Sequence, residues 1–152
     1  MPSAGDIVVP TTDAWDAYSP TWTVTGSPSL GTGGTLTGRY KQLGKTVHLS
    51  IYGLFGSAST NPGTGGWSFS LPLTASSTSN QVRLGAAYLR DASVGSSGHF
   101  VGVCAIQPLL STTALNAFVP TGGAANSQVG FATPFAWTIS DHFSFTITYE
   151  AA

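Results

Sequence analysis

The amino-acid sequence predicts an all-β protein, an antiparallel β-sandwich or jelly roll with an extended N-terminal arm. The first observation is composition: 41% of the 152 residues are hydrophobic and only 7% are charged, against about 25% in an average globular protein. The second is an alternation of apolar and polar residues in several segments, which is typical of strands with one buried face. The third is the gathering of glycines and prolines into short clusters between those segments, as expected for tight turns.

Residues 1–19 are expected to form the arm. They contain three of the six acidic residues, show no period of two, and end in the aromatic pair Trp15 and Tyr18. From residue 20 onward the alternating pattern takes over, with no compositional break and no internal repeat. We therefore expect an arm over 1–19 and a single β-sandwich domain over 20–152.

Three segments alternate most clearly, namely 45–55, 67–71 and 142–149. In the first and last of them, the apolar residues expected on the buried faces are Val47, Leu49, Ile51 and Phe55, and Phe143, Phe145, Ile147 and Tyr149. Weaker strand candidates fill the rest of the chain, at 21–25, 35–42, 81–89, 99–106, 114–119, 128–131 and 135–139. About nine or ten short strands with regular turns favour a sandwich or jelly roll over other all-β folds.

The residue types that carry catalysis do not form a known pattern. The three histidines, His48, His99 and His142, lack the spacings of metal ligands. The sequence has no G-x-S-x-G motif, and its single glutamate, Glu150, argues against a pair of catalytic carboxylates. Asp141 is expected to end the turn before the last strand. We therefore expect no enzymatic activity, no bound metal and no cofactor.

The sequence also contains few features that indicate a cellular compartment or a binding partner. The lone cysteine, Cys104, excludes an internal disulfide and is expected to be a buried, unreactive thiol. A net charge of −1 gives no general attraction for nucleic acid or an anionic membrane. No segment approaches the roughly 18 apolar residues of a membrane-spanning helix, and the first residues do not form a signal peptide. We expect neither nucleic-acid binding nor membrane insertion.

The basic residues Arg39, Lys41 and Lys45 form the one cluster of like charge. Two interpretations stay open. They could contact an acidic partner, such as a capsid surface or an anionic cell-wall polymer. Alternatively, they form a solvated hairpin edge, where lysines discourage strand-to-strand aggregation.

The four tryptophans also allow two interpretations. Trp15, Trp22, Trp67 and Trp137 could line a sugar-binding shelf. Trp67 and Trp137 lie in expected strands, which favours a place in the core or in a subunit contact.

So few charges leave a surface poorly protected against association, and a lone sandwich has open edge strands. A closed homo-oligomer buries both, and by analogy we expect a homotrimer.

Four segments, in order, resemble virion proteins of tailed phages, especially phages of actinobacteria. They are Trp15-Asp-Ala-Tyr-Ser-Pro-Thr-Trp-Thr23, Leu36-Thr-Gly-Arg-Tyr-Lys-Gln-Leu-Gly-Lys-Thr-Val47, Gly66-Trp-Ser-Phe-Ser-Leu-Pro72, and 134–152 with its Thr148-Tyr-Glu-Ala-Ala152 end. The resemblance covers residues 15–152. It implies a β-sandwich, trimeric and exposed on the surface of a phage particle that is made in the host cytoplasm.

The resemblance leaves two roles on the virion. Many similar modules end a longer tail protein, whereas here about 14 residues precede the first motif. This favours a head decoration or cement protein whose arm binds the major capsid protein, with Asp13, Trp15, Tyr18 and Trp22 as candidate contacts. The alternative is a tail-tip or minor tail module that binds a receptor, such as a glycan, on the host cell. The resemblance carries over no catalytic residue.

Overall fold

The computed structural model describes residues 14–123 and 125–152, and over these residues the fold is all-β with antiparallel pairing, as predicted. The strands are β1 (Asp16–Tyr18), β2 (Trp22–Thr25), β3 (Thr35–Leu43), β4 (Thr46–Leu54), β5 (Thr64–Ser70), β6 (Arg83–Arg90), β7 (His99–Ile106), β8 (Ala114–Pro120), β9 (Asn126–Gln128) and β10 (His142–Glu150). Two short 3₁₀ helices, η1 (Thr78–Asn80) and η2 (Ala92–Ser97), flank β6.

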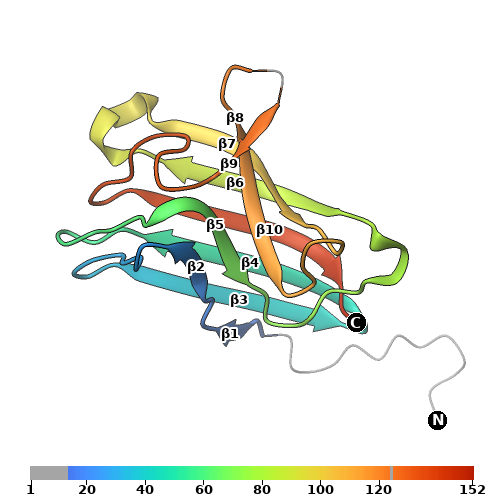
Figure 1. The fold of residues 1–152 in the computed structure, drawn as a ribbon. Coiled ribbons are helices and arrows are strands. Elements are labelled where there is room, and N and C mark those ends of the chain that lie inside the picture. Colours follow the sequence, from blue (N-terminus) through green and yellow to red (C-terminus); the bar gives the residue numbers. More distant parts are fainter. Residues whose placement is uncertain (1–13, 124) are drawn as a thin grey trace, which may run out of the picture.

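The strands form one continuous path in the order β1-β3-β4-β10-β6-β7-β8-β5-β2, with β9 paired to β8. The path curls like a half-barrel, so that β5 and β2 pass across one side of β3, β4 and β10 (Figure 1). Strand β8 makes the corner, because it pairs with β7 through residues 116–118 and with β5 through residues 114–115. The last strand in the sequence, β10, lies in the middle of the sheet between β4 and β6.

The hairpin of β3 and β4 shows how local sequence sets this arrangement. Its turn consists of Gly44 and Lys45, since Leu43 pairs with Thr46. Gly44 has a φ of 60°, a value that glycine adopts without strain and that a type II′ turn needs at its first central residue. The tight turn fixes the register, and the alternation in β4 then buries Val47, Leu49 and Ile51, as predicted.

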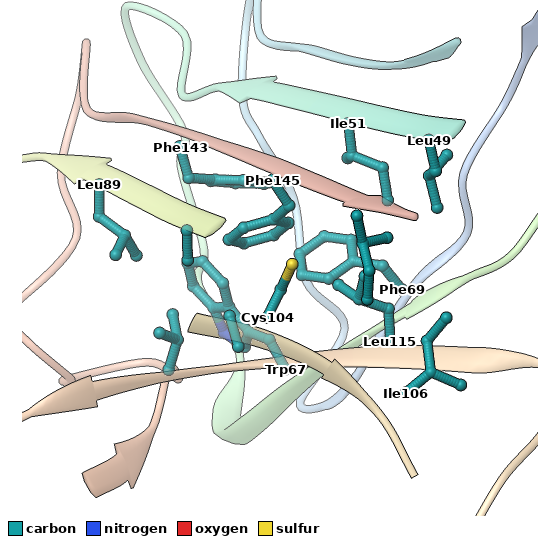
Figure 2. Packing of buried hydrophobic residues seen from close by; sticks show 14 of the residues in the cluster. Leu49, Ile51, Trp67, Phe69, Leu89, Cys104, Ile106, Leu115, Phe143 and Phe145 are labelled. Carbon is teal, nitrogen blue, oxygen red and sulfur yellow. The ribbon is translucent and has the colours of Figure 1, made fainter. Parts of the chain in front are cut away.

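The core lies inside the curl and is rich in aromatic rings (Figure 2). Phe143 and Phe145 of β10 face inward, and each lies 5.3 Å from the ring of Phe69 on β5. Trp67 of β5 and Trp137 are both buried, with ring centroids 4.6 Å apart. The alternation predicted for 67–71 and 142–149 is therefore confirmed, and the two tryptophans are core residues.

Two of the weaker strand predictions were wrong. Residues 135–139 form a loop, and the strand expected over 128–131 is instead β9, Asn126–Gln128. Pro134 has no N–H to offer a neighbouring strand, and the Trp137 indole N–H donates to the Gly130 carbonyl at 2.9 Å. The apolar residues of this segment therefore anchor a loop to the core.

The end of the predicted arm also forms regular structure. Residues 16–18 are strand β1, which pairs antiparallel with β3 at the edge of the sheet. The segment 1–19 thus contributes an edge strand to the sheet.

Candidate binding surface

The side of β3, β4, β10 and β6 that points away from the core is here called the outer face. On β4 it carries His48, Ser50 and Tyr52, which alternate with the buried residues. On β10 it carries Ser144, Thr146 and Thr148 by the same alternation. Hydroxyl groups and polar rings thus cover the centre of this face.

A hollow opens on the outer face where the hydrogen-bonded ladder between β6 and β10 ends. The pairing of these strands ends at Thr146 and Ala86. The next residue, Gly85, lies so close to β10 that a Cβ there would come within 2.1 Å of the Thr146 carbonyl oxygen. Further along, Arg83 and Glu150 join the strands again through an ion pair of 3.6 Å. Residues of both strands at this end of the ladder line the hollow.

This β6–β10 hollow has a volume of about 370 Å³. It is lined by Trp15, His48, Leu49, Ser50, Leu84, Gly85, Thr146, Ile147 and Thr148. Nδ1 of His48 lies 2.9 Å from the Thr148 hydroxyl, so these two side chains hold each other in place. Among the described residues, no carboxylate lines the hollow.

A second hollow of about 320 Å³ adjoins the first and is lined by Trp15, Arg39, Ser50 and Thr146. Trp15 forms a wall of both hollows although it is 40% exposed. An indole that large is usually covered by protein, and here much of it faces solvent.

Beside the hollows, four rings follow one another across β4, β10, β6 and β7. The ring centroids of Tyr52 and His142 are 6.0 Å apart, those of His142 and Tyr88 are 6.2 Å apart, and those of Tyr88 and His99 are 5.8 Å apart. The Tyr88 hydroxyl is 2.5 Å from Nδ1 of His99. We call these residues the ring row.

The structure separates the residues expected to bind a partner through the arm. Asp13 lies outside the described residues, and Trp15 lies on the outer face. Tyr18 packs inward, where its hydroxyl donates to the Ser70 carbonyl at 3.3 Å and burial raises the pKa of the phenol. Trp22 also packs inward, edge-on to Trp67 with centroids 4.9 Å apart. Only Trp15 of the three described residues is turned toward solvent.

The basic cluster stays together along β3 and its turn. Arg39 and Lys41 are two residues apart on β3 and so share the outer face, while the exposed Lys45 lies in the turn. Arg39 lines the second hollow, and Lys41 is paired with His48 of β4 in the sheet register. The structure thus brings two of the three basic residues to the face that carries the hollows.

Asp141 and Cys104 are both buried in this fold. Asp141 is fully buried, and its carboxylate accepts hydrogen bonds from the backbone N–H groups of Ala92, at 2.8 Å, and Thr138, at 2.6 Å. It ends the turn before β10, as expected. Cys104 is buried, and this burial raises the pKa of its thiol to about 12. Such a thiol is held in its unreactive form at neutral pH.

Within residues 14–123 and 125–152, no group of three or more His, Cys, Asp or Glu side chains is placed to hold a metal ion. In the same part of the chain, no helix has the length and apolar character needed to cross a membrane.

Sequence reasoning missed the two hollows and the ring row. The available signal was the alternation of polar and apolar residues, which placed His48 and His142 on the polar faces of their strands. The pairing of β4 with β10, and of β10 with β6, then decides which polar residues become neighbours.

Comparisons of the chain with protein-family models, with curated protein sequences and with solved structures found no match.

Proposed function

We propose that this chain is a non-enzymatic structural protein of a bacteriophage virion, a head decoration or cement protein that its N-terminal arm anchors to the major capsid protein. The observation that carries the proposal is where the four phage-like segments lie in the fold. Trp22, Trp67 and Trp137 come from three of these segments and meet in the aromatic core. The remaining segment supplies Tyr40, whose ring lies 6.0 Å from that of Tyr18.

This convergence supports the proposal because the resembling residues are those that build the fold. A chain that shares these core positions with virion proteins has a physical reason to share their architecture. Architecture alone does not determine function, so the role on the virion needs a direct test.

The position of β1 supports anchoring through the arm. Residues 16–18 are fixed to the sheet edge by their pairing with β3, and the Tyr18 hydroxyl bonds across to β5. Any pull on residues 1–14 is therefore transmitted to the folded domain. Many weakly held copies on one capsid would together stabilise the particle.

Within this proposal, the curled sheet is a sandwich of jelly-roll type and three copies form a homotrimer. The contact of Phe69 with Phe143 and Phe145 supports the sandwich, because β5 and β10 pack face to face without being neighbours in the sheet. The low charge and the exposed Leu84 and Val101 support association between copies.

The test is to locate the protein on intact particles with a gold-labelled antibody. Label spread over the head is the expected result. Particles that lack the protein should then release their genome at a lower temperature. A variant without residues 1–14 should keep its fold and oligomeric state but lose particle binding. Undiminished occupancy by this variant would contradict anchoring through the arm.

The second candidate is a tail-tip or minor tail module that binds a receptor on the host cell. The hollows beside Trp15 favour it, because a cement protein does not need a ligand site on an exposed sheet face. Label confined to the tail, together with saturable binding of the purified protein to host cells, would replace the decoration role with this one.

A further inference from the structure

We propose that the outer face is a carbohydrate-binding surface, on which one sugar unit packs against Trp15 and further units follow the ring row. This goes beyond the virion role, since either position on a particle could carry such a site. It depends on the geometry of residues 14–123 and 125–152, Trp15 at the end of the arm included, and on nothing before residue 14.

Trp15 is the first reason. Its indole forms a wall of two hollows and remains 40% exposed. A large aromatic side chain left in water can bury its ring against a ligand at low cost, because it has few rotatable bonds to fix. A pyranose ring offers a matching surface, since its C–H groups form an apolar patch and its hydroxyls surround that patch.

The lining of the hollows is the second reason. Ser50 and Thr146 line both hollows, and Thr148 and His48 line the larger one. A hydroxyl both donates and accepts a hydrogen bond, so these side chains can pair with sugar hydroxyls in either sense. Among the described residues, Arg39 is the only Lys, Arg, Asp or Glu that lines either hollow, a composition that suits a polyhydroxylated ligand better than a strongly ionic one.

Size supports the same ligand. Sites for small molecules typically occupy about 300–1,000 Å³. Each hollow, at about 370 Å³ and about 320 Å³, lies at the lower end of this range. Because Trp15 and Ser50 belong to both hollows, two linked sugar units could occupy them side by side.

The ring row gives the surface its length. Tyr52 and Tyr88 both pair with Ser144 in the sheet. Ser144 lies two residues along β10 from Thr146, which pairs with Ser50, so the two sets of side chains form adjacent rows on the same face. Same-face rows of a sheet are about 7 Å apart, so the ring row adjoins the hollows. Tyrosine and histidine rings have an apolar body and a polar edge, as the two sides of a sugar require. An oligosaccharide should therefore bind more tightly than its monosaccharide.

Arg39 makes a further distinction possible. Its side chain lines the second hollow and would pair with a carboxylate on an acidic sugar. If the site selects acidic sugars, binding should weaken as salt concentration rises. If it selects neutral sugars, binding should be insensitive to salt.

The experiment is titration of the ¹⁵N-labelled full chain, followed by NMR, with three hexasaccharide probes. They are the β1,4-linked hexamers of glucose and of N-acetylglucosamine, which are neutral, and the hexamer of galacturonic acid, which is acidic. The expected result is a saturable shift of the Trp15 indole N–H signal with at least one probe. That signal is assigned by its loss in Trp15→Phe, and the signals of the buried Trp67 and Trp137 should not move.

Two variants test the site itself. Trp15→Ala should weaken binding about tenfold or more, and Ser50→Leu should block it by filling both hollows. Each is expected to fold, because both positions face away from the core, and an unchanged amide spectrum elsewhere confirms this. Leu110→Ala removes an apolar side chain of high exposure that lines neither hollow, and it should bind as the parent does.

Three outcomes would overturn the proposal. The first is no saturable shift with any of the three probes. The second is binding that Trp15→Ala and Ser50→Leu leave unchanged. The third is a Trp15 signal that responds to protein concentration and not to sugar, which would show that a second copy covers this face. None of these depends on where the protein lies on a particle, so the proposed virion role stands or falls separately.

Discussion

The ring of Tyr18 occupies the space in which a side chain of residue 38 would lie. A Cβ built on Gly38 would come within 2.1 Å of Cε1 of Tyr18. The two residues are direct partners in the pairing of β1 with β3. From this position the Tyr18 hydroxyl reaches the Ser70 carbonyl on β5. Because residue 38 is a glycine, the edge strand β1 can pair with β3 and also form a hydrogen bond to β5.

Gly38→Ala should therefore destabilise the protein by about 1–3 kcal/mol, because the methyl group displaces the Tyr18 ring and its hydrogen bond. Urea unfolding measures the change. In a Tyr18→Ala background the same substitution should cost almost nothing, since the clash is gone. Gly123→Ala is the control, because a Cβ there comes within 4 Å of no atom of the described residues beyond its chain neighbours. Equal costs of Gly38→Ala in the two backgrounds would contradict this account.

The central strands could be predicted from sequence because local pattern and burial agree there. In β4 and β10 every second residue is apolar, and those residues form the core. The loop at 135–139 shows the limit of this reasoning. Phe135 and Trp137 alternate as in a strand, but each packs on the aromatic cluster from a loop. Alternation indicates which side chains face the core, but it does not indicate whether the backbone between them pairs with a neighbouring strand.

The candidate site could not be predicted because it depends on long-range pairing. Ser50, Thr146 and Leu84 are far apart in sequence and meet only because β10 inserts between β4 and β6. The hollow itself arises where Gly85 ends the β6–β10 ladder. Trp15 was identified as a candidate contact, but nothing in its sequence neighbourhood indicated that it would lie over these strands.

The buried carboxylate of Asp141 should contribute strongly to the free energy of unfolding. Asp141→Ala should lower the free energy of unfolding by about 2–4 kcal/mol, because two backbone N–H groups lose a charged acceptor in a buried site. Asp141→Asn should fall between the parent and Asp141→Ala, since an amide can accept only one of the two bonds. Asp16→Asn changes an exposed carboxylate and should stay within about 0.5 kcal/mol of the parent. Chemical denaturation of the three variants provides the comparison, and a harmless Asp141→Ala would refute this role.

Stability should fall in alkaline solution. Burial raises the pKa of the Cys104 thiol from 9.0 to about 12 and that of the Tyr149 phenol from 10.0 to about 12. The folded protein keeps these protons at a pH where the unfolded chain has released them. The stabilisation is therefore complete below pH 9 and is lost progressively as the pH rises toward 12.

Each fully buried group of this kind contributes a slope of up to about 1.4 kcal/mol per pH unit. Unfolding free energies measured at a series of pH values above 8 test this expectation. Cys104→Ala and Tyr149→Phe should each reduce the slope, whatever their effect on stability at neutral pH. A curve that is flat in the parent across this range would contradict the prediction.

Substitution by Phe should lower the free energy of unfolding by different amounts at the two neighbouring tryptophans Trp22 and Trp67. The Trp67 indole N–H donates to the Pro62 carbonyl at 3.0 Å, whereas the Trp22 indole nitrogen is buried without a hydrogen-bond partner among the residues that the structure describes. Trp67→Phe loses both ring volume and a satisfied hydrogen bond, which should cost about 2–4 kcal/mol. Trp22→Phe loses ring volume but also removes an unpaired donor, so its cost should be smaller by about 1–2 kcal/mol. Denaturant unfolding of both variants measures the difference, with Trp15→Phe as the exposed control. If Trp22→Phe proved the more damaging of the two, the Trp22 N–H must have a partner, such as an ordered water molecule, that stabilises the fold.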